Sequence, residues 1–324
     1  MANADDHASV CVLAPEPLLT VEIESSNGTD GAEIHVHPGG QGLWVAHMAC
    51  SLGARVVVCG PFGGEPGAVA AHLLRDAGLD VRAASGPASG AVVEDRRGDG
   101  PTSVAVMHPE RPDRHSLDDL YGMTLVTALE TDVCVLTGTH LTGSVPPDFY
   151  ARLTRDLAAA GRTVVADLSG DAFEEVAGEP IAVLKVSHEE LVEHGVAADD
   201  SLAALRRVAK KVVAQGPGAV VVSRAGEPAL LVTPDGARLV ETPDVTTLEH
   251  RGAGDSMTAG IAVGLARGLD LPDAVRLGAA AGALNVTRHG LGTGRREQIE
   301  VFARRVAVTD LGRRDDRRRK DEEE

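Results

Sequence analysis

The stretch Arg251-Gly252-Ala253-Gly254-Asp255-Ser256 runs directly into a helical pattern of apolar residues. Its two glycines allow a tight turn that exposes backbone N–H groups at the start of the helix, where unpaired donors and the helix dipole favour an anion. The carboxylate of Asp255 lies in the first turn, beside these donors. Phosphoryl transfer to an alcohol requires both features, donors for developing negative charge and a carboxylate that can take a proton. We therefore interpret Gly252–Gly254 as an anion hole and Asp255 as a general base.

The chain on the N-terminal side of this stretch alternates between apolar runs and helical patterns. We expect strands at 10–14, 55–59, 133–136, 163–167, 181–186 and 219–223, and helices at 42–52, 67–77, 148–160 and 201–214. A further helix is expected from residue 272 to about 289, after the helix that begins at the glycine turn. Continuous apolar strands separated by helices are typical of a parallel sheet covered on both faces. The pattern predicts a doubly wound α/β fold.

Two segments, 20–37 and 88–108, show strand patterns with no helix within them. They predict either a small antiparallel sheet that projects from the main domain or ordinary edge hairpins. We expect a single domain over residues 1–309. The segment 310–324 is almost entirely charged, with no apolar residue after Leu311, and is expected to be disordered.

Composition excludes several classes of partner. The formal net charge of −17 argues against binding to nucleic acid or to an anionic membrane, since both need a basic surface. No apolar run reaches the length of a membrane span, and the N-terminus has no signal-peptide pattern. The four cysteines form no C-x-x-C pair, which favours free thiols in a reducing cytoplasm, and the twelve histidines show no metal-ligand spacing.

The segment 247–260, which contains the glycine turn, resembles the C-terminal signature of the ribokinase/PfkB family of carbohydrate kinases, and its G-A-G-D matches position for position. Other segments are most similar to the 1-phosphofructokinase and tagatose-6-phosphate kinase branch of that family. They are His37-Pro-Gly-Gly-Gln-Gly-Leu-Trp-Val-Ala46, Leu141-Thr-Gly-Ser-Val-Pro-Pro147, Asp167-Leu-Ser-Gly170, Lys185-Val-Ser-His-Glu-Glu-Leu191 and the segment from Asn285 to Thr293. The resemblance extends from residue 10 to about residue 308.

The resemblance implies a three-layer α/β/α ribokinase-like domain with a small β-sheet lid, which often pairs between subunits, so that a homodimer is expected. It implies ATP and Mg²⁺ as cofactors, with Asp255 as the base and Glu190 organising the magnesium through water. The implied nucleotide-binding residues are Lys185, Ser187, Ser223, Gly226 and Asn285. The implied residues for the small-molecule acceptor are Thr20, Gly39, Gly40, Gln41, Trp44 and Arg251.

Several of these positions depart from the family pattern. Gln41 replaces a lysine, Trp44 an asparagine and Thr20 an aspartate, while Ser187 replaces an asparagine and Pro228 a glycine. Glutamine keeps hydrogen bonds and loses the charge that recognises a sugar phosphate, and tryptophan adds a flat apolar wall. Arg251, directly before the anion hole, could reach a phosphate instead, or form a surface salt bridge of small value.

Three functions remain open from the sequence. The first is ATP-dependent phosphoryl transfer to a hydroxyl of a sugar or sugar phosphate, as in a hexose-phosphate kinase. The second is a kinase for a nucleoside or an unphosphorylated sugar, suggested by Trp44 and the missing lysine. The third is a degenerate, non-catalytic protein that senses a nucleotide or sugar phosphate, which the intact loop ending at Asp255 opposes.

Overall fold

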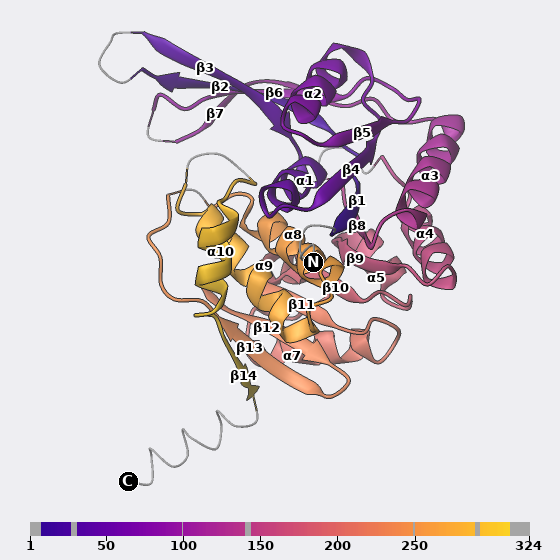
Figure 1. The fold of residues 1–324 in the computed structure, drawn as a ribbon, viewed down its shortest axis with the longest axis vertical. Coiled ribbons are helices and arrows are strands. Elements are labelled where there is room, and N and C mark those ends of the chain that lie inside the picture. Colours follow the sequence, from indigo (N-terminus) through magenta and orange to yellow (C-terminus); the bar gives the residue numbers. More distant parts are fainter. Residues whose placement is uncertain are drawn as a thin grey trace, which may run out of the picture.

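The computed structural model describes residues 8–26, 31–98, 100–139, 144–248, 250–288 and 292–311. Its centre is a ten-stranded sheet (Figure 1). In spatial order the strands are β14 (Ala307–Asp310), β13 (Gly236–Glu241), β12 (Glu227–Thr233), β11 (Val220–Arg224), β10 (Val183–Ser187), β9 (Thr163–Asp167), β8 (Val133–Thr137), β1 (Ser9–Leu13), β4 (Arg55–Gly60) and β5 (Asp80–Ala83). The strands from β11 to β5 pair in parallel, whereas β12, β13 and β14 are antiparallel additions at one edge.

Helices cover both faces of this sheet. One face carries α1 (Gln41–Ser51), α2 (Gly64–Asp76), α8 (Ala253–Ala266), α9 (Leu271–Asn285) and α10 (Arg296–Ala303). The other carries α3 (Arg114–Leu129), α4 (Pro147–Ala159), α5 (Gly170–Val176), α6 (His188–Glu193) and α7 (Leu202–Val213). Along β1, Val10 and Val12 enter the first apolar core and Cys11 and Leu13 enter the second, as the alternation of side chains along a strand requires. The expected three-layer α/β/α fold is confirmed.

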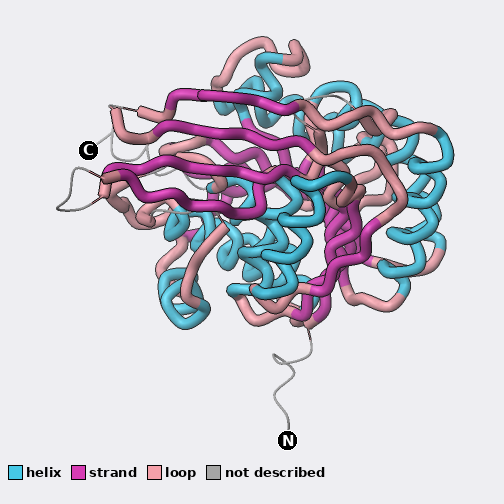
Figure 2. Tube along the Cα trace, turned by 90° about the horizontal axis from the view of Figure 1, so that it is seen from above, coloured by secondary structure: helices cyan, strands magenta, loops and turns pink. Residues whose placement is uncertain are grey.

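A second sheet of four strands forms the lid, in the order β3 (Ala32–Gly39), β2 (Leu18–Ser25), β6 (Gly90–Asp95) and β7 (Thr102–Met107). It projects at the upper left of Figure 1, and Figure 2 shows its strands apart from those of the central sheet. The expectation of an antiparallel lid is wrong for the central pair, because β2 and β6 run parallel. The chain leaves the lid after β3, passes through α1, β4, α2 and β5, and only then returns as β6. Strands β2 and β6 therefore enter the lid in the same direction.

The structure corrects two expectations at the C-terminal end. Asp310, the expected first residue of the charged tail, ends β14, and Leu311 is buried in the core. The rest of the expected tail lies outside the described residues. The helix expected to reach about residue 289 ends at Asn285.

Close helix packing positions the glycine turn. A Cβ atom on Gly260 of α8 would lie 2.6 Å from Cα of Gly278 on α9, so the two backbones approach as only glycine permits. Among the described helices, none has both the length and the apolar character needed to span a membrane.

Candidate active site

The glycine turn lies at the N-terminus of α8, which packs against the central strands β8 and β9. Gly252 is the N-cap, with φ 74° in the left-handed region, and no side chain of the described residues caps it. Its carbonyl accepts the N–H of Ser256 at 2.9 Å, which begins the helix. The first N–H groups of α8 therefore lie at the glycine turn, where the sequence predicts an anion hole at Gly252, Ala253 and Gly254.

A buried polar cluster of Lys185, Asp167 and Thr258 lies next to this turn. Nζ of Lys185 on β10 lies 3.0 and 3.1 Å from the two carboxylate oxygens of Asp167, at the end of β9. The hydroxyl of Thr258 on α8 donates to the same carboxylate at 2.6 Å. A Cβ atom on Gly254 would lie 2.7 Å from Nζ of Lys185, so the ammonium group lies directly against the anion hole. Lys185, expected to bind nucleotide, is thus buried in an ion pair with Asp167.

Asp255, in the first turn of α8, has a pKa raised to about 7. Burial of the carboxyl group is the main cause; the charges of Asp167 and Glu190 raise the pKa further, and Lys185 opposes them. A carboxylate with a pKa near neutrality can both accept and release a proton at physiological pH. The expected general base therefore has suitable electrostatics.

Ser187 and Glu190 begin helix α6 with a capping box. The Ser187 hydroxyl accepts the N–H of Glu190 at 3.1 Å, and Oε2 of Glu190 accepts the N–H of Ser187 at 2.8 Å. Both residues thus have a structural role at this end of the sheet. Within the described ranges, no group of three or more His, Cys, Asp or Glu side chains could hold a metal ion on its own.

Ser223 pairs with Ser187 across β10 and β11, and its carbonyl lies 3.3 Å from Nδ1 of His188. Gly226 follows in the β11–β12 turn, beside Ala225 with φ 49°, and open space surrounds it. Pro228, which departs from the family pattern, lies next to a break in the β11–β12 register, where a strand tolerates a missing N–H.

Asn285 ends α9 and is fully buried. Its Nδ2 donates to the carbonyl of Arg251 at 2.9 Å, and its Oδ1 accepts the N–H of Gly292 at 3.0 Å. The side chain expected at the nucleotide therefore holds the residue before the anion hole and ties it to the segment that follows α9.

A cavity of about 310 Å³ opens between the lid and α1. It is lined by Glu16, Leu18, Gly40, Gln41, Gly42, Trp44, Val92 and Gly138. Three of the six expected acceptor residues, Gly40, Gln41 and Trp44, are among these, whereas Thr20, Gly39 and Arg251 are not. A Cβ atom on Gly39 would lie 2.2 Å from Oγ1 of Thr20, so Gly39 leaves room for the Thr20 side chain between the paired lid strands.

The polar groups of this cavity have specific neighbours. Oε1 of Gln41 accepts the N–H of Gly138 at 2.8 Å, so the glutamine that replaces lysine binds the backbone directly after strand β8. The indole N–H of Trp44 is buried and has no hydrogen-bond partner within the part of the chain that the structure describes. Glu16, which we did not predict, contributes a carboxylate from the loop after β1 and is 7% exposed. Its only sequence signal is a charged residue between two prolines directly after a buried strand.

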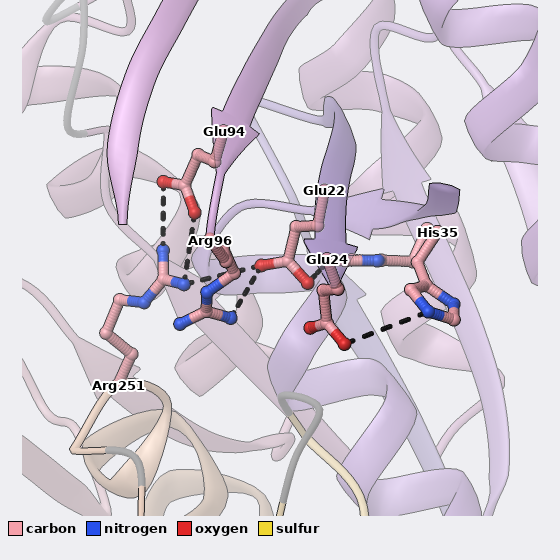
Figure 3. Close-up of polar contacts among 7 residues, drawn as sticks. Glu22, Glu24, His35, Glu94, Arg96 and Arg251 are labelled. Atoms are coloured by element: carbon pink, nitrogen blue, oxygen red, sulfur yellow. Dashed lines mark hydrogen bonds and ion pairs between the residues drawn. The ribbon is translucent and has the colours of Figure 1, made fainter. Parts of the chain in front are cut away.

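Arg251 is directed at the lid (Figure 3). Its guanidinium group lies 3.2 Å from each carboxylate oxygen of Glu94 on β6, and 3.4 Å from Oε1 of Glu22 on β2. Arg96 donates to the same oxygen of Glu22 at 2.9 Å. Of the two roles expected for Arg251, the structure shows the ion pair, with lid carboxylates as its partners, and the phosphate contact stays a prediction. Residues 141–143, 249 and 289–291, which are parts of three stretches used for the resemblance, lie outside the described residues.

The chain is similar to several known proteins. The sequence profile of "pfkB family carbohydrate kinase" matches residues 18–298. The 1-phosphofructokinase of Bacillus subtilis (strain 168) is 33% identical over 182 residues, 56% of this chain and 59% of that protein, so the match spans less than two thirds of that relative. The ATP-dependent 6-phosphofructokinase isozyme 2 of Mycobacterium tuberculosis (strain ATCC 25618 / H37Rv) is 31% identical over 284 residues, 82% of this chain and 78% of that protein.

A solved structure shares the fold. The ribokinase of Arabidopsis thaliana, complexed with ribose and ATP, superposes with a TM-score of 0.70 and 19% identity, over 91% of this chain and 99% of that chain. The expected ribokinase-like architecture is confirmed. Because the profile covers most of the chain and includes both the lid and the G-A-G-D turn, the chain belongs to the pfkB family of carbohydrate kinases.

Proposed function

We propose that this carbohydrate kinase transfers the γ-phosphoryl group of ATP to a hydroxyl of a hexose phosphate, with Asp255 as the general base. The observation that carries the proposal is a carboxylate of pKa about 7 in the first turn of a helix whose N-cap, Gly252, is left-handed. Asp255 would take the hydroxyl proton as the oxygen–phosphorus bond forms. The N–H groups of Gly252–Gly254 would bind the charge on the transferring group.

The nucleotide would bind along the carboxyl edge of the sheet, near Ser187, Ser223 and Gly226. This placement is supported by the register that sets Ser187 beside Ser223 and by the open space around Gly226. Lys185, which lies against Gly254, would act on the nucleotide through its charge. Asn285 would act through the backbone of Arg251, whose carbonyl it binds.

The residues at the phosphate end suit magnesium. Mg²⁺ keeps several waters and usually takes one or two protein carboxylates together with substrate phosphates, and Glu190, whose charge acts on Asp255, offers such oxygens close to the glycine turn. When bound, the metal would supply positive charge that offsets the charge of the ATP phosphates. Glu190 would act through water, since one of its oxygens accepts the N–H of Ser187.

The acceptor would occupy the cavity between the lid and α1, against Gly40, Gln41 and Trp44. A hexose phosphate is supported by the names of the relatives, a 1-phosphofructokinase and a 6-phosphofructokinase. A second candidate is an unphosphorylated sugar or a nucleoside. It is favoured by the cavity itself, because its lining includes the carboxylate of Glu16 and the indole of Trp44 but no Lys or Arg among the residues that the structure places there.

An acceptor panel tests the proposal. The protein is assayed with Mg-ATP and, in separate reactions, fructose 6-phosphate, fructose 1-phosphate, tagatose 6-phosphate, fructose, ribose and adenosine, with ADP formation as the readout. We expect magnesium-dependent turnover with a hexose phosphate above the ATPase rate without acceptor. Turnover only with fructose, ribose or adenosine would support the second candidate. Saturable ligand binding without turnover on any acceptor would indicate the non-catalytic sensor and contradict both kinase proposals.

We also propose that two copies associate through the lid, in the cytoplasm. Residues paired across the lid alternate between its two faces. Glu22, His35 and Glu94 share the face that carries the contacts with Arg251, whereas Val21, Val36 and Val93 share the opposite face. On that outer face Ile34 is 66% exposed and Val36 43%. An apolar sheet face of this kind needs a cover, and a second lid provides one of matching character.

The cytoplasmic location is supported by four free cysteines, three of them buried.

A further inference from the structure

The lid and the anion hole are joined by charged side chains. Arg251 is the residue directly before the N-cap Gly252, and it contacts carboxylates on two lid strands, Glu94 on β6 and Glu22 on β2. Figure 3 shows the guanidinium group reaching from the loop before α8 to these strands. The contacts join residues that are more than 150 positions apart in the sequence. They connect the lid with the loop before α8.

The arrangement is specific in geometry and balanced in charge. Glu94 receives one nitrogen of Arg251 on each oxygen, the two-pronged pairing that arginine forms and lysine cannot. Glu22 is shared between Arg251 and Arg96, so two cations meet two carboxylates. The side chains of Glu22 and Glu94 are only 8% and 15% exposed, and that of Arg251 is 34% exposed. Water and salt therefore screen these pairs less than they screen pairs on the open surface.

The same residue is fixed on its backbone side. The carbonyl of Arg251 accepts the amide of the buried Asn285, and the next residue turns the chain into α8 with a positive φ. A shift of the Arg251 side chain with the lid would thus act on the backbone that presents the anion hole. Misplacement of a catalytic group by about 1 Å can lower a rate about a hundredfold.

We propose that Arg251 is a positioning residue, which couples the closed lid to the anion hole through Glu94 and Glu22. In this arrangement, lid closure over the acceptor and the placement of the Gly252–Gly254 N–H groups occur together. A kinase built this way makes its anion hole fully competent only when the lid is in place, which limits transfer of phosphate to water. The inference rests on the proposed phosphoryl transfer at the same turn.

A double-mutant cycle tests this coupling. The variants are Arg251→Gln, Glu94→Gln and the double variant, with Arg251→Lys as the conservative change. Arg97→Gln is the matched control, because Arg97 also pairs with a lid carboxylate, Asp95, but on the exposed surface and without reaching the loop before α8. We expect each single exchange to lower kcat by about tenfold or more, since the anion hole is misplaced, with a smaller effect on the KM for ATP. The double variant should be no worse than the worse single variant. Arg251→Lys should restore part of the rate, and Arg97→Gln should match the wild type.

Amide hydrogen exchange gives a second readout that does not need turnover. Arg251→Gln and Glu94→Gln should each speed exchange both in β6 and in the first turn of α8. A defect confined to one of these segments would speed exchange in that segment alone. Unchanged kcat and exchange in Arg251→Gln, or single effects that multiply in the double variant, would overturn the coupling. A wild-type protein that shows no turnover on any acceptor would instead contradict the proposed function, and exchange would still decide whether the lid and the turn are coupled.

Discussion

At the scale of single residues, the site depends on how buried charges act on one carboxylate. Asp255 lies near Asp167 and Glu190, whose charges oppose its ionisation, and near Lys185, which favours it. Burial outweighs the attraction of the lysine, and the pKa rises to about 7. The same lysine is held by Asp167 and lies against Gly254, so the pKa of the proposed base and the surroundings of the proposed anion hole depend on the same ion pair.

A pH dependence follows from this arrangement. Below about pH 7 Asp255 carries its proton and cannot accept another, so kcat/KM should fall about tenfold per unit as the pH decreases below 7, and level off above it. Glu190→Gln removes one of the charges that raise this pKa but keeps the capping box, which glutamine also forms. The acid limb of its pH profile should therefore move to lower pH.

Steady-state kinetics between pH 5 and 9 checks this, with Glu189→Gln, the same exchange at the exposed neighbour, as the control. A substrate phosphate, whose second pKa is about 6, also titrates in this range, but the Glu190 exchange would not move it. A limb that stays in place in Glu190→Gln would therefore argue against titration of Asp255.

Some residue roles could be predicted from the sequence and others could not. The G-A-G-D turn is local, because its glycines, its carboxylate and the helix after it are consecutive. The partners of Arg251 are not local, since Glu22 and Glu94 reach it only after the lid has folded over the turn. The resemblance of its segment predicts that Lys185 binds the nucleotide. Its burial against Asp167 could not be predicted, because it depends on the pairing of β9 with β10.

At the scale of elements, the alternation of apolar runs and helical patterns predicted the core well. Each strand and helix expected from 10 to 223 outside the lid is present, with ends that shift by at most a few residues. The sequence pattern predicts neither α3, whose apolar residues lie among many polar ones, nor the β12–β13 hairpin, although β12 contains the buried apolar run 229–232. The parallel pairing within the lid could not be predicted, because it joins strands separated by two helices and two strands of the main domain.

The lid sheet provides a prediction about association. If a second lid covers its outer face, a lysine at Ile34 and at Val36 places two charges in an apolar contact, and the double variant should be monomeric. Val126→Lys on α3 is the matched control, since Val126 is also exposed but lies on a helix of the main domain. Sedimentation velocity checks both: wild type and Val126→Lys should sediment as dimers. A monomeric wild type, or a dimer that persists in Ile34→Lys/Val36→Lys, would contradict association through the lid.

At the scale of the whole molecule, the two sheets have separate tasks. The central sheet and its helices hold the turn, the buried Lys185–Asp167 pair and the capping box of Glu190 at one edge. The lid contributes Val92 to the wall of the cavity in which we propose that the acceptor binds, and it holds Arg251 through Glu94 and Glu22. The family could be predicted from the sequence because the turn keeps its pattern, whereas the acceptor remains a proposal because Gln41 and Trp44 depart from it.

The central claim is that Asp255 is the base of a phosphoryl transfer, and kcat of Asp255→Asn, measured on the best acceptor of the panel, tests it most directly. Asp171→Asn is the matched control, because Asp171 also lies in the first turn of a helix, α5, but is exposed and away from the turn. Thermal shift with ATP shows that both variants fold and bind nucleotide. We predict that Asp255→Asn lowers kcat by about 10²- to 10⁴-fold, since the amide cannot accept the proton, and that Asp171→Asn leaves it unchanged. A folded Asp255→Asn protein with wild-type kcat would contradict the account.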